Sequence, residues 1–561
     1  MKFKAIEIRN FRNFDDISID LSNKNVLFGL NDVGKTNFLY ALRFVFDRDV
    51  RKQNFIDSDF YKKGVDKAIE IIVSIDISEE EDPDDQKLRA RLKGAMRSGQ
   101  DTVYIKLRAE YDKKEMMGIP VLYWGGDKDD LEEMRCYGST YDIDYVFNVI
   151  YIDAYVDLYA LFKRKVNALI VNDKEQDKKT IDDINNIFKE LNDKISTLSG
   201  IQALEKKLAP EYQKFRHGDV SVSIKSEIAV KGLFSGIVPY IKQDQDDMLY
   251  PASGEGRKKL LVYSIFDLLS KDQEERKINL FLIEEPENHL HRSMQISLSH
   301  ILFGEQKYQY LFLTTHSPYV LIEMDHVNLL RIYNQDKVTS KSVLYEVPND
   351  FISQRKMLNV GLVEAIFADK VLLVEGPSEK ILFEKVLSVI DPLFETSGAY
   401  ILSVNGFGFS PYLRILSKLG IKTIIKTDND LRCSKDGKYS VLGFMRINRL
   451  IGKTELPEVP ILTGGCDAKR NLYLSNAAAL DQIRKEKRIF LSKCSLEEDL
   501  DEVIHDEMSE YLRDTNPVSH LQQAKWCNMV KLSEKLSESD CKKIYNHYNF
   551  ACLKEVLPNA T

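Results

Sequence analysis

The apolar residues of the chain follow two different spacings, and the changes between them divide the chain into regions. An alternating stretch at residues 1–11 (MKFKAIEIRNF) and a short apolar run at residues 24–28 (KNVLF) predict strands. After the loop GLNDVGKT, apolar residues at helical spacing up to Phe46 predict a helix. Residues 68–77 (AIEIIVSIDI) and 103–125 predict further strands. Together these segments fit an α/β core with an antiparallel sheet beside it.

Residues 160–215 have a different character, because they are rich in Lys, Asp, Glu and Asn. Apolar residues recur there at alternating steps of four and three, which places them along one face of a helix. The pattern spans only about two heptads and therefore excludes a long coiled coil. We expect a helical insertion that either pairs with another helix or packs against its own domain. The residues that form this apolar face are Ile184, Phe188, Leu191, Ile195 and Leu198.

From residue 220 onward the pattern returns to α/β. Residues 220–228 predict a strand, and helix and strand patterns alternate from about 253 to 331. A second α/β pattern runs from Lys370 to about Leu500, after a polar connection, and the remaining residues have a mainly helical pattern. The length of 561 residues fits three or four domains at roughly 150 residues each.

The overall charge and the cysteine content narrow the class of protein. The net charge of -8 does not mark a nucleic-acid binder, but local basic patches decide such binding more than the total. Seven cysteines without a CxxC pair predict reduced thiols, and we expect neither a disulfide framework nor a structural zinc site. Residues 1–11 lack the apolar stretch of a signal peptide, and no apolar run reaches the ~20 residues that span a membrane. We therefore expect a cytoplasmic protein without a membrane partner.

The loop that follows residues 24–28 matches the complete phosphate-binding pattern G-x-x-x-x-G-K-[ST]. Gly29 and Gly34 let backbone N–H groups turn towards phosphate, and the start of the following helix adds partial positive charge. We expect Lys35 to reach the β- and γ-phosphates of ATP and the Thr36 hydroxyl to bind Mg²⁺. The alternative is a chance glycine-rich turn, which the full match between a strand and a helix disfavours.

Later segments supply the other half of an ATPase site. The buried run INLFLI ends in Glu284 and Glu285, which we assign to holding Mg²⁺ and to polarising the attacking water, respectively. Ser253 and Gly254 begin an SGEG turn before a helix, which suits binding of a γ-phosphate across a dimer. His316, in the turn THSP after another strand, is placed to sense the γ-phosphate, although a lone histidine there is more often structural.

The order of these segments resembles the ATP-binding cassette (ABC) heads of SMC and RecF proteins. This chain departs from them in carrying Glu284, where such heads usually have aspartate, and in lacking a long coiled-coil insertion. Gln53 is a candidate for the glutamine of the Q-loop. The nucleotide-site residues expected from motif and resemblance are Gly29, Asn31, Gly34, Lys35, Thr36, Asn37, Ser253, Gly254, Glu284 and His316.

Carboxylates at the ends of two predicted strands form a second constellation. Glu375 ends the strand of the run VLLVEGPSEK, and Asp428 and Asp430 follow the run IKTIIKT. The carboxyl ends of parallel strands meet at one edge of a sheet, so these groups can converge and bind one or two Mg²⁺ or Mn²⁺ ions. The pattern resembles a Toprim domain, and we include Glu379 among its metal ligands. The alternative is an inert α/β domain in which these residues serve as caps and turns.

Three residues further along the chain are expected to complete this site. Glu497 and Asp499 follow the strand-like run RIFLS, and Lys525 lies in a helix with basic flanks. A lysine near a scissile phosphate can stabilise developing charge. From the local pattern alone, a solvated charged surface explains these three residues equally well.

An ABC head followed by a Toprim domain resembles the OLD (overcoming lysogenization defect) family of nucleases over essentially the whole chain. The longer runs GLNDVGKTNFLYALRF, IEEPENHLHRSMQI and VLLVEGPSEKILFEKVL resemble the nuclease subunits of Gabija antiphage systems. This resemblance implies a nucleotide-regulated, Mg²⁺-dependent endonuclease acting on double-stranded DNA. It also implies a homotetramer built as a dimer of dimers and a UvrD-like helicase partner, GajB. The residues that it places in the nuclease and ATPase chemistry are Glu375, Glu379, Asp428, Asp430, Glu497, Asp499, Lys525 and Glu285.

The resulting expectation is a multidomain α/β protein with an ABC-type, SMC- and RecF-like ATPase head. We place the head at residues 1–159 and 217–345, interrupted by a helical dimerisation insert at 160–216. A Toprim α/β domain with a helical C-terminal part follows at 346–561. Two alternatives remain open: a stand-alone OLD-family nuclease without a helicase partner, and a DNA-tethering ABC ATPase whose Toprim domain only binds.

Overall fold

The computed structural model of the chain forms two compact units. The first contains Met1–Ile152, Gln273–Glu287 and His291–Thr561, and the second contains Asp153–Asp272 and Asn288–Leu290. No helix among the described residues has both the length and the apolar character needed to span a bilayer. The structure describes residues 1–29, 34–92, 95–96, 99–155, 178–203, 206, 240–243, 246–251, 261, 277–304, 308–335 and 337–557.

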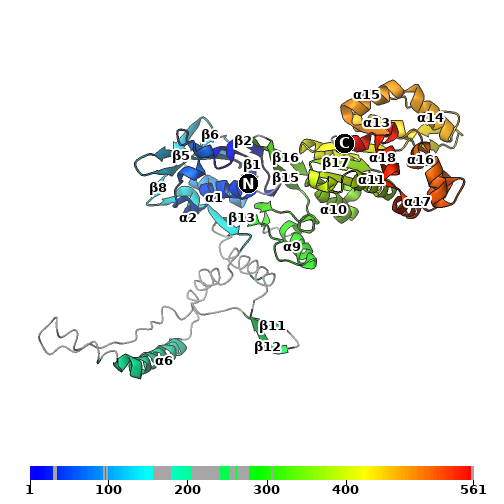
Figure 1. Cartoon of the computed structure of the whole chain (residues 1–561). Coiled ribbons are helices and arrows are strands. Elements are labelled where there is room, and N and C mark those ends of the chain that lie inside the picture. The colour runs from blue at the N-terminus through cyan, green and yellow to red at the C-terminus, as the bar shows by residue number, and fades with distance from the viewer. Residues whose placement is uncertain are drawn as a thin grey trace, which may run out of the picture. The chain divides into compact units, whose positions relative to one another are not determined.

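The first sheet is antiparallel and has six strands in the order β2-β1-β4-β5-β6-β7 (Figure 1). Burial alternates along its strands, as expected of a sheet with one face on the core. The strands predicted at 68–77 and 103–125 are confirmed as β4 and the hairpin β5–β6. The six strands are β1 (Lys2–Phe11), β2 (Phe14–Asp20), β4 (Ile69–Asp76), β5 (Thr102–Asp112), β6 (Met117–Asp127) and β7 (Asp130–Glu133).

The second sheet has the order β10-β13-β14-β3-β15-β16. Its first five strands are parallel, and β16 pairs antiparallel with β15. Helix α1 (Lys35–Phe46) follows β3 and buries Phe38, Leu39 and Leu42 in a core that both sheets share. The six strands are β3 (Lys24–Phe28), β10 (Phe147–Ile152), β13 (Ile278–Glu284), β14 (Leu311–Thr314), β15 (Val327–Gln335) and β16 (Lys337–Tyr345).

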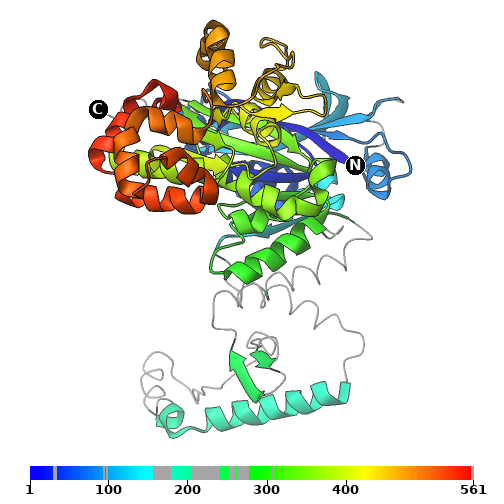
Figure 2. The ribbon, with the colours of Figure 1, turned by 90° about the vertical axis from the view of Figure 1, so that its right-hand side faces the viewer.

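The third sheet is wholly parallel and has the order β18-β17-β19-β22. Helices follow β17, β18 and β22, whereas a hairpin follows β19. The C-terminal helices share an apolar core with α11. These helices, drawn in orange and red in Figure 2, confirm the predicted helical tail. The strands are β17 (Lys370–Val374), β18 (Ala399–Ser403), β19 (Lys422–Thr427) and β22 (Ile489–Leu491). The helices are α11 (Pro377–Ile390), α12 (Ser410–Lys418), α16 (Leu496–Leu512), α17 (Pro517–Lys535), α18 (Glu538–Asn546) and α19 (Cys552–Val556).

Further helices and strands lie around these sheets. Between β19 and β22 the chain forms a two-stranded hairpin and three helices, and the head contains several further elements. The first group is β20 (Leu431–Cys433), β21 (Tyr439–Val441), α13 (Leu442–Ile451), α14 (Cys466–Ser475) and α15 (Ala477–Lys487). The second is α2 (Arg48–Arg51), α3 (Pro83–Arg91), β8 (Cys136–Tyr137), β9 (Thr140–Tyr141) and α9 (Arg292–Gly304).

Helix α10 (Arg355–Ile366) connects the head to the third sheet. Asn359, on its buried face, accepts the Tyr345 hydroxyl at 2.5 Å. Its amide Nδ2 donates to the carbonyls of Ile322 and Met324 at 3.0 and 2.9 Å. A buried polar group needs such partners, so this asparagine fixes the helix against the head.

The second unit contains the predicted helical segment. Helix α6 (Lys178–Ser196) contains four residues of the predicted apolar face, Ile184, Phe188, Leu191 and Ile195, whereas Leu198 lies beyond its end. Leu191 and Leu198 are exposed within the described residues. A two-stranded hairpin, β11 (Tyr240–Gln243) and β12 (Asp246–Pro251), follows. The strand predicted at 220–228 lies outside the described residues.

Candidate functional site

The loop after β3 closes around Lys35. Gly29 and Gly34 adopt φ values of 150° and 104°, and a Cβ atom on Gly34 would lie 2.1 Å from Nδ2 of Asn13. Lys35 is buried, and its Nζ donates to the carbonyl of Gly29 at 3.1 Å. The middle of the loop, residues 30–33 with Asn31, lies outside the described residues. The two ends of the loop therefore hold the ammonium at the start of α1, where a phosphate binds in loops of this kind.

The first turn of α1 supports this loop. Thr36 is exposed, in the place expected of a hydroxyl that binds a nucleotide-bound cation. Asn37 donates from Nδ2 to Oδ1 of Asn13 at 2.9 Å and accepts Nη1 of Arg12 at 3.0 Å. Because Asn13 packs directly on Gly34, Asn37 acts on the loop through Asn13.

The ends of β13 and β14 bring the predicted acids and the histidine together. Glu284 is buried at the end of β13. Glu285 has a φ of 38°, and its N–H donates to the carbonyl of Thr314 at 2.9 Å. The Nε2 of His316 lies 3.7 Å from Oε1 of Glu285. The left-handed backbone of Glu285 turns its carboxylate towards the histidine, at a cost typical of strained functional positions.

His316 also lies in the field of Lys35. Burial and the Lys35 charge lower the pKa of His316, and the Glu285 charge opposes them. Glu287, which sequence reasoning missed, accepts the backbone N–H of His316 at 2.6 Å, and burial raises the pKa of Glu287. Its only sequence signal was its place in the acidic run EEPE. The structure thus brings Lys35, Glu285 and His316 into one site. The predicted Ser253 and Gly254 lie outside the described residues.

The third sheet gathers the predicted Toprim acids at the carboxyl ends of β17 and β19. Glu375 follows β17, and Asp428 and Asp430 follow β19, its neighbour in the sheet. Oε1 of Glu375 accepts the Asp428 N–H at 2.9 Å and the Thr427 hydroxyl at 2.5 Å. The two strand ends are therefore in direct contact, as the parallel topology requires.

Arg446, from α13, joins the same carboxylates. Its Nη2 lies 2.7 Å from Oδ2 of Asp430, and its Nη1 pairs with Oε1 of Glu375 and with the Thr427 hydroxyl. Sequence reasoning missed Arg446, because nothing in the run GFMRINRL separates one arginine from the next. The guanidinium supplies positive charge to Glu375 and Asp430.

The negative charges of Glu379 and Asp428 are less well balanced by positive groups than those of Glu375 and Asp430. Glu379 lies in the first turn of α11 and is only 8% exposed. Burial, together with the charges of Glu375 and Glu497, raises the pKa of Glu379 to about 7. Burial and the charges of Glu379 and Glu375 likewise raise the pKa of Asp428 well above its usual range. Two carboxyls whose ionised forms are disfavoured in this way create a demand for a bound cation.

The loop between β22 and α16 completes the cluster. The Ser492 hydroxyl donates to Oδ1 of Asp428 at 3.0 Å, and the Ser495 hydroxyl donates to Oε2 of Glu497 at 2.7 Å. Glu497 is close enough for its charge to raise the pKa of Glu379. The structure therefore gathers Glu375, Glu379, Asp428, Asp430 and Glu497.

Known proteins resemble this chain in both modules. The model of the AAA ATPase domain matches residues 1–123 and 147–321, and that of the overcoming lysogenization defect protein-like TOPRIM domain matches residues 366–430. Endonuclease GajA of Bacillus cereus (strain VD045) is 43% identical over 573 residues, covering 99% of each chain. The chain belongs to the GajA family.

Two further matches cover a smaller share of the chain at lower identity. The Old nuclease of Escherichia phage P2 is 22% identical over 472 residues, which cover 77% of each chain. The SMC head bound to the C-winged helix domain of ScpA is 14% identical, with a TM-score of 0.36, over 61% of this chain and 98% of that one. The TOPRIM match ends at Asp430. For this GajA-family chain, Arg446 and Glu497 lie beyond that match, and the geometry brings both to the site.

Asp499, which sequence reasoning grouped with the metal ligands, has a different environment. Its Oδ2 lies 3.0 Å from Nζ of Lys426, and its Oδ1 accepts the Lys493 N–H at 3.0 Å. Both side chains of the pair are almost fully buried, and Lys426 also donates to the carbonyl of Asn549 at 3.1 Å. With both oxygens committed, Asp499 joins β19 to α16 underneath the carboxylate cluster.

Lys525 lies on α17, and its side chain is outside the described part of the structure. Helix α17 packs against α11 and α16, the helices that begin with Glu379 and Glu497 in their first turns. The catalytic role of Lys525 in this GajA-family chain thus stays a prediction.

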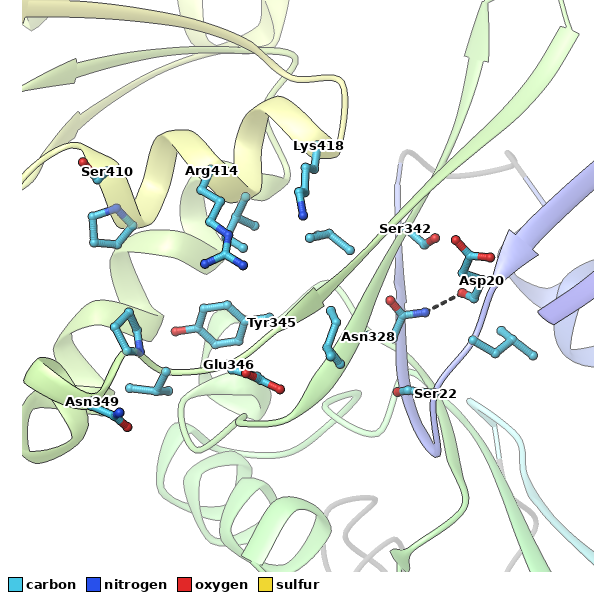
Figure 3. Close-up of a pocket in the computed structure, with 17 residues that line it drawn as sticks. Asp20, Ser22, Asn328, Ser342, Tyr345, Glu346, Asn349, Ser410, Arg414 and Lys418 are labelled. Carbon is cyan, nitrogen blue, oxygen red and sulfur yellow. Dashed lines mark hydrogen bonds between the residues drawn. The ribbon is translucent and has the colours of Figure 1, made fainter. Parts of the chain in front are cut away.

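A cavity of about 840 Å³ lies between the head and the Toprim module. Arg414 and Lys418 of α12 extend into it above the strands that carry Asn328 and Tyr345 (Figure 3). Its lining also contains acidic residues, Asp20 and Glu346, so the charges are mixed. Among the described residues, none of the predicted nucleotide or nuclease residues lines this cavity, which distinguishes it from both sites of the GajA-family chain.

Proposed function

We propose that this chain is a metal-dependent DNA endonuclease whose cutting is controlled by nucleotide bound at the head. The TOPRIM match and the identity to endonuclease GajA support the nuclease, and the AAA ATPase match supports coupling to ATP. Its role would be that of the nuclease subunit of a Gabija antiphage system. The observation that carries the proposal is the convergence of Glu375, Glu379 and Asp428 on one sheet edge.

The carboxylate cluster fits a hard divalent cation. Mg²⁺ and Mn²⁺ prefer carboxylate oxygens, and the raised pKa values of Glu379 and Asp428 support a shortage of positive charge there. A bound ion would stabilise the charge that develops on the attacking and leaving oxygens of a phosphodiester. The residues that would hold one or two such ions are Glu375, Glu379, Asp428, Asp430 and Glu497.

The chain's own residues orient this site. The Thr427 hydroxyl fixes Glu375, and the Ser492 hydroxyl fixes Asp428. Arg446 places a guanidinium beside the same carboxylates, and a guanidinium binds phosphate oxygens with directed hydrogen bonds. We propose that Arg446 exchanges part of its contact with the acids for a phosphate when DNA binds.

Phe367 offers a physical route for control by nucleotide. Its ring lies 5.8 Å from that of Phe28, the last residue before the phosphate loop, and 6.1 Å from that of His316. Phe367 ends α10 and precedes β17, the strand that leads into Glu375. A change at the nucleotide site can therefore act on the start of β17 through the ring of Phe367.

In the nucleotide site, Lys35 would bind the phosphates, and Thr36 and Glu284 would hold the Mg²⁺ of ATP. Glu285 and His316 would lie near the γ-phosphate.

The substrate would be double-stranded DNA. By analogy with its family, the assembly would be a homotetramer, a dimer of dimers, joined by the UvrD-like helicase GajB. Besides the Phe367 ring contacts, an ion pair between Arg331 and Asp369 at 2.5 Å links the head to the Toprim module.

The experiment is cleavage of plasmid and linear DNA by the full chain with Mg²⁺ or Mn²⁺, with and without ATP. Glu375→Gln should lose cutting and retain nucleotide binding, and Lys35→Ala should cut without responding to ATP. Glu395→Gln, at an exposed glutamate, is the matched control and should behave as wild type. Absence of cutting with either metal, even with the helicase added, would favour a Toprim domain that only binds. An ATP response retained by Lys35→Ala would refute control through this loop.

A further inference from the structure

Two cysteines and a glutamate form a cluster beside the carboxylate site. The ligand atoms of Cys466, Cys494 and Glu498 all lie within 4.8 Å of one another. Both cysteines are free thiols. Cys466 is distant in sequence from Cys494 and Glu498, which lie in one short segment, so the spacing rules for paired cysteines gave no signal for them.

The backbone around the cluster suits negatively charged ligands. Cys466 is the first residue of α14, and Glu498 lies in the first turn of α16. Cys494 directly precedes Ser495, the N-cap of α16. The partial positive charge at a helix start stabilises thiolates and carboxylates. Two helices thus direct their positive ends towards the same three side chains.

Among the described residues, the side chains that donate hydrogen bonds to the Glu498 carboxylate are neutral. The Glu498 carboxylate accepts Nε2 of Gln522 at 3.3 Å and shares the Ser495 hydroxyl with Glu497, and both of these partners are neutral. Lys469 donates to the backbone carbonyl of Cys494 at 3.4 Å rather than to the carboxylate. Cys494 is 2% exposed, and burial, the Cys466 thiol and the Glu498 charge raise the pKa of its thiol, whereas the Lys469 charge opposes them.

We propose that Cys466, Cys494 and Glu498 bind a zinc ion, with a fourth position for water. Thiolates and a carboxylate together select a borderline-soft divalent cation, whereas the all-oxygen nuclease cluster selects Mg²⁺ or Mn²⁺. Each thiol transfers its proton to solvent as its sulfur binds the metal. This assignment replaces the expectation that the chain has no structural zinc site, and it does not depend on the proposed nuclease activity.

The zinc would fasten α14 to the loop between β22 and α16. Asn429, between the two aspartates of the nuclease site, already touches both segments. Its Nδ2 donates to the carbonyl of Lys469 on α14 at 2.9 Å and to that of Lys493 in the loop at 3.3 Å. The metal and Asn429 therefore hold the same two segments, and the zinc ion would act as a positioning device for the nuclease site.

Titration of the reduced full-length chain with Co²⁺, followed by absorption spectroscopy, tests this proposal. Co²⁺ bound to thiolate gives a sulfur-to-metal charge-transfer band that oxygen ligands at the nuclease site do not give. We expect one such site per chain, displaced by Zn²⁺, with a higher melting temperature in the presence of Zn²⁺. Cys466→Ser and Cys494→Ser should lose the band, and Glu498→Gln should weaken cobalt binding.

Cys541→Ser is the matched control, because Cys541 is fully buried and belongs to another part of the module. It should keep the band. A reduced wild-type chain without a thiolate band would overturn the assignment. So would a band that survives in both Cys466→Ser and Cys494→Ser. A Cys466–Cys494 disulfide as the stable form under reducing conditions would likewise replace the metal site by a thiol pair.

Discussion

The ammonium of Lys426 lies 3.0 Å from Oδ2 of Asp499, and both side chains are about 1% exposed. This pair lies directly below the strand end that carries Asp428. The Asp499 charge raises the pKa of Lys426 against the opposing effect of burial, which keeps the lysine charged. An ion pair of this kind is costly to break, because the remaining charge stays buried without a partner.

Asp499→Ala is therefore expected to destabilise the Toprim module by about 3–5 kcal/mol. Denaturant unfolding should show a lower free energy of unfolding, and cleavage assays should show a parallel loss of nuclease activity. A double variant, Lys426→Met with Asp499→Leu, should recover most of the stability, since it removes both charges. A chain with Asp499→Ala that unfolds like wild type but no longer binds metal would instead make Asp499 a ligand.

Arg446→Ala should make the stability of the Toprim module more dependent on metal. Without the guanidinium, Glu375 and Asp430 lose their positive partner, so a divalent ion relieves more repulsion than in wild type. We expect a lower melting temperature without metal and a larger rise on adding Mn²⁺. Arg449→Ala, an exposed arginine on the same helix, is the control. Equal metal-induced shifts in all three chains would count against this role.

Phe367→Ala should weaken the effect of ATP on cutting without abolishing either nucleotide binding or basal nuclease activity. The substitution removes the ring contacts to Phe28 and His316 and leaves both sites intact. Cleavage rates with and without ATP, compared with nucleotide affinity, provide the measurement. Phe351→Ala, at a ring that contacts Phe407 within the Toprim region, is a matched control. An undiminished ATP response in Phe367→Ala would mean that the two modules communicate by another route.

Gly34→Ala should abolish nucleotide binding. The added Cβ would meet Nδ2 of Asn13 at 2.1 Å, and the φ of 104° is unfavourable for alanine. Gly138→Ala is the comparison, because Gly138 has a φ of 69° and open space around its Cβ position. Equilibrium binding of a labelled ATP analogue should be lost only in the first variant. Normal binding by Gly34→Ala would show that the loop adopts a different conformation when nucleotide is bound.

Motifs with a fixed backbone context could be predicted from the sequence. The phosphate loop between β3 and α1 requires a strand, a glycine turn and a helix in immediate succession. The sequence pattern predicted all three. The meeting of the strand-end acids Glu375 and Asp428 could also be predicted, because parallel strands bring their carboxyl ends together. Strand β16 was missed: its run KVTSKSVLY is largely polar, because it is an edge strand with β15 as its one partner in the sheet.

Contacts between residues far apart in the sequence could not be predicted. Arg446 reaches Glu375 across 71 positions of the sequence, and no local pattern distinguishes it from Arg449. Asp499 was grouped with Glu497 because the two share one acidic run and because the family resemblance implies that both are metal ligands. On helix α16, however, residues two apart point in different directions. Glu497 therefore faces the carboxylate cluster, and Asp499 faces Lys426.

The order of strands in the head has a consequence for synthesis on the ribosome. In the second sheet, β3 lies between β14 and β15, and β10 pairs with β13. The ribosome therefore synthesises β3 and β10 long before the strands that pair with them. The third sheet uses only strands between Lys370 and Leu491. We expect the head to stay incomplete until Tyr345 has emerged, with nascent edges that require protection, whereas the Toprim sheet assembles from a contiguous stretch.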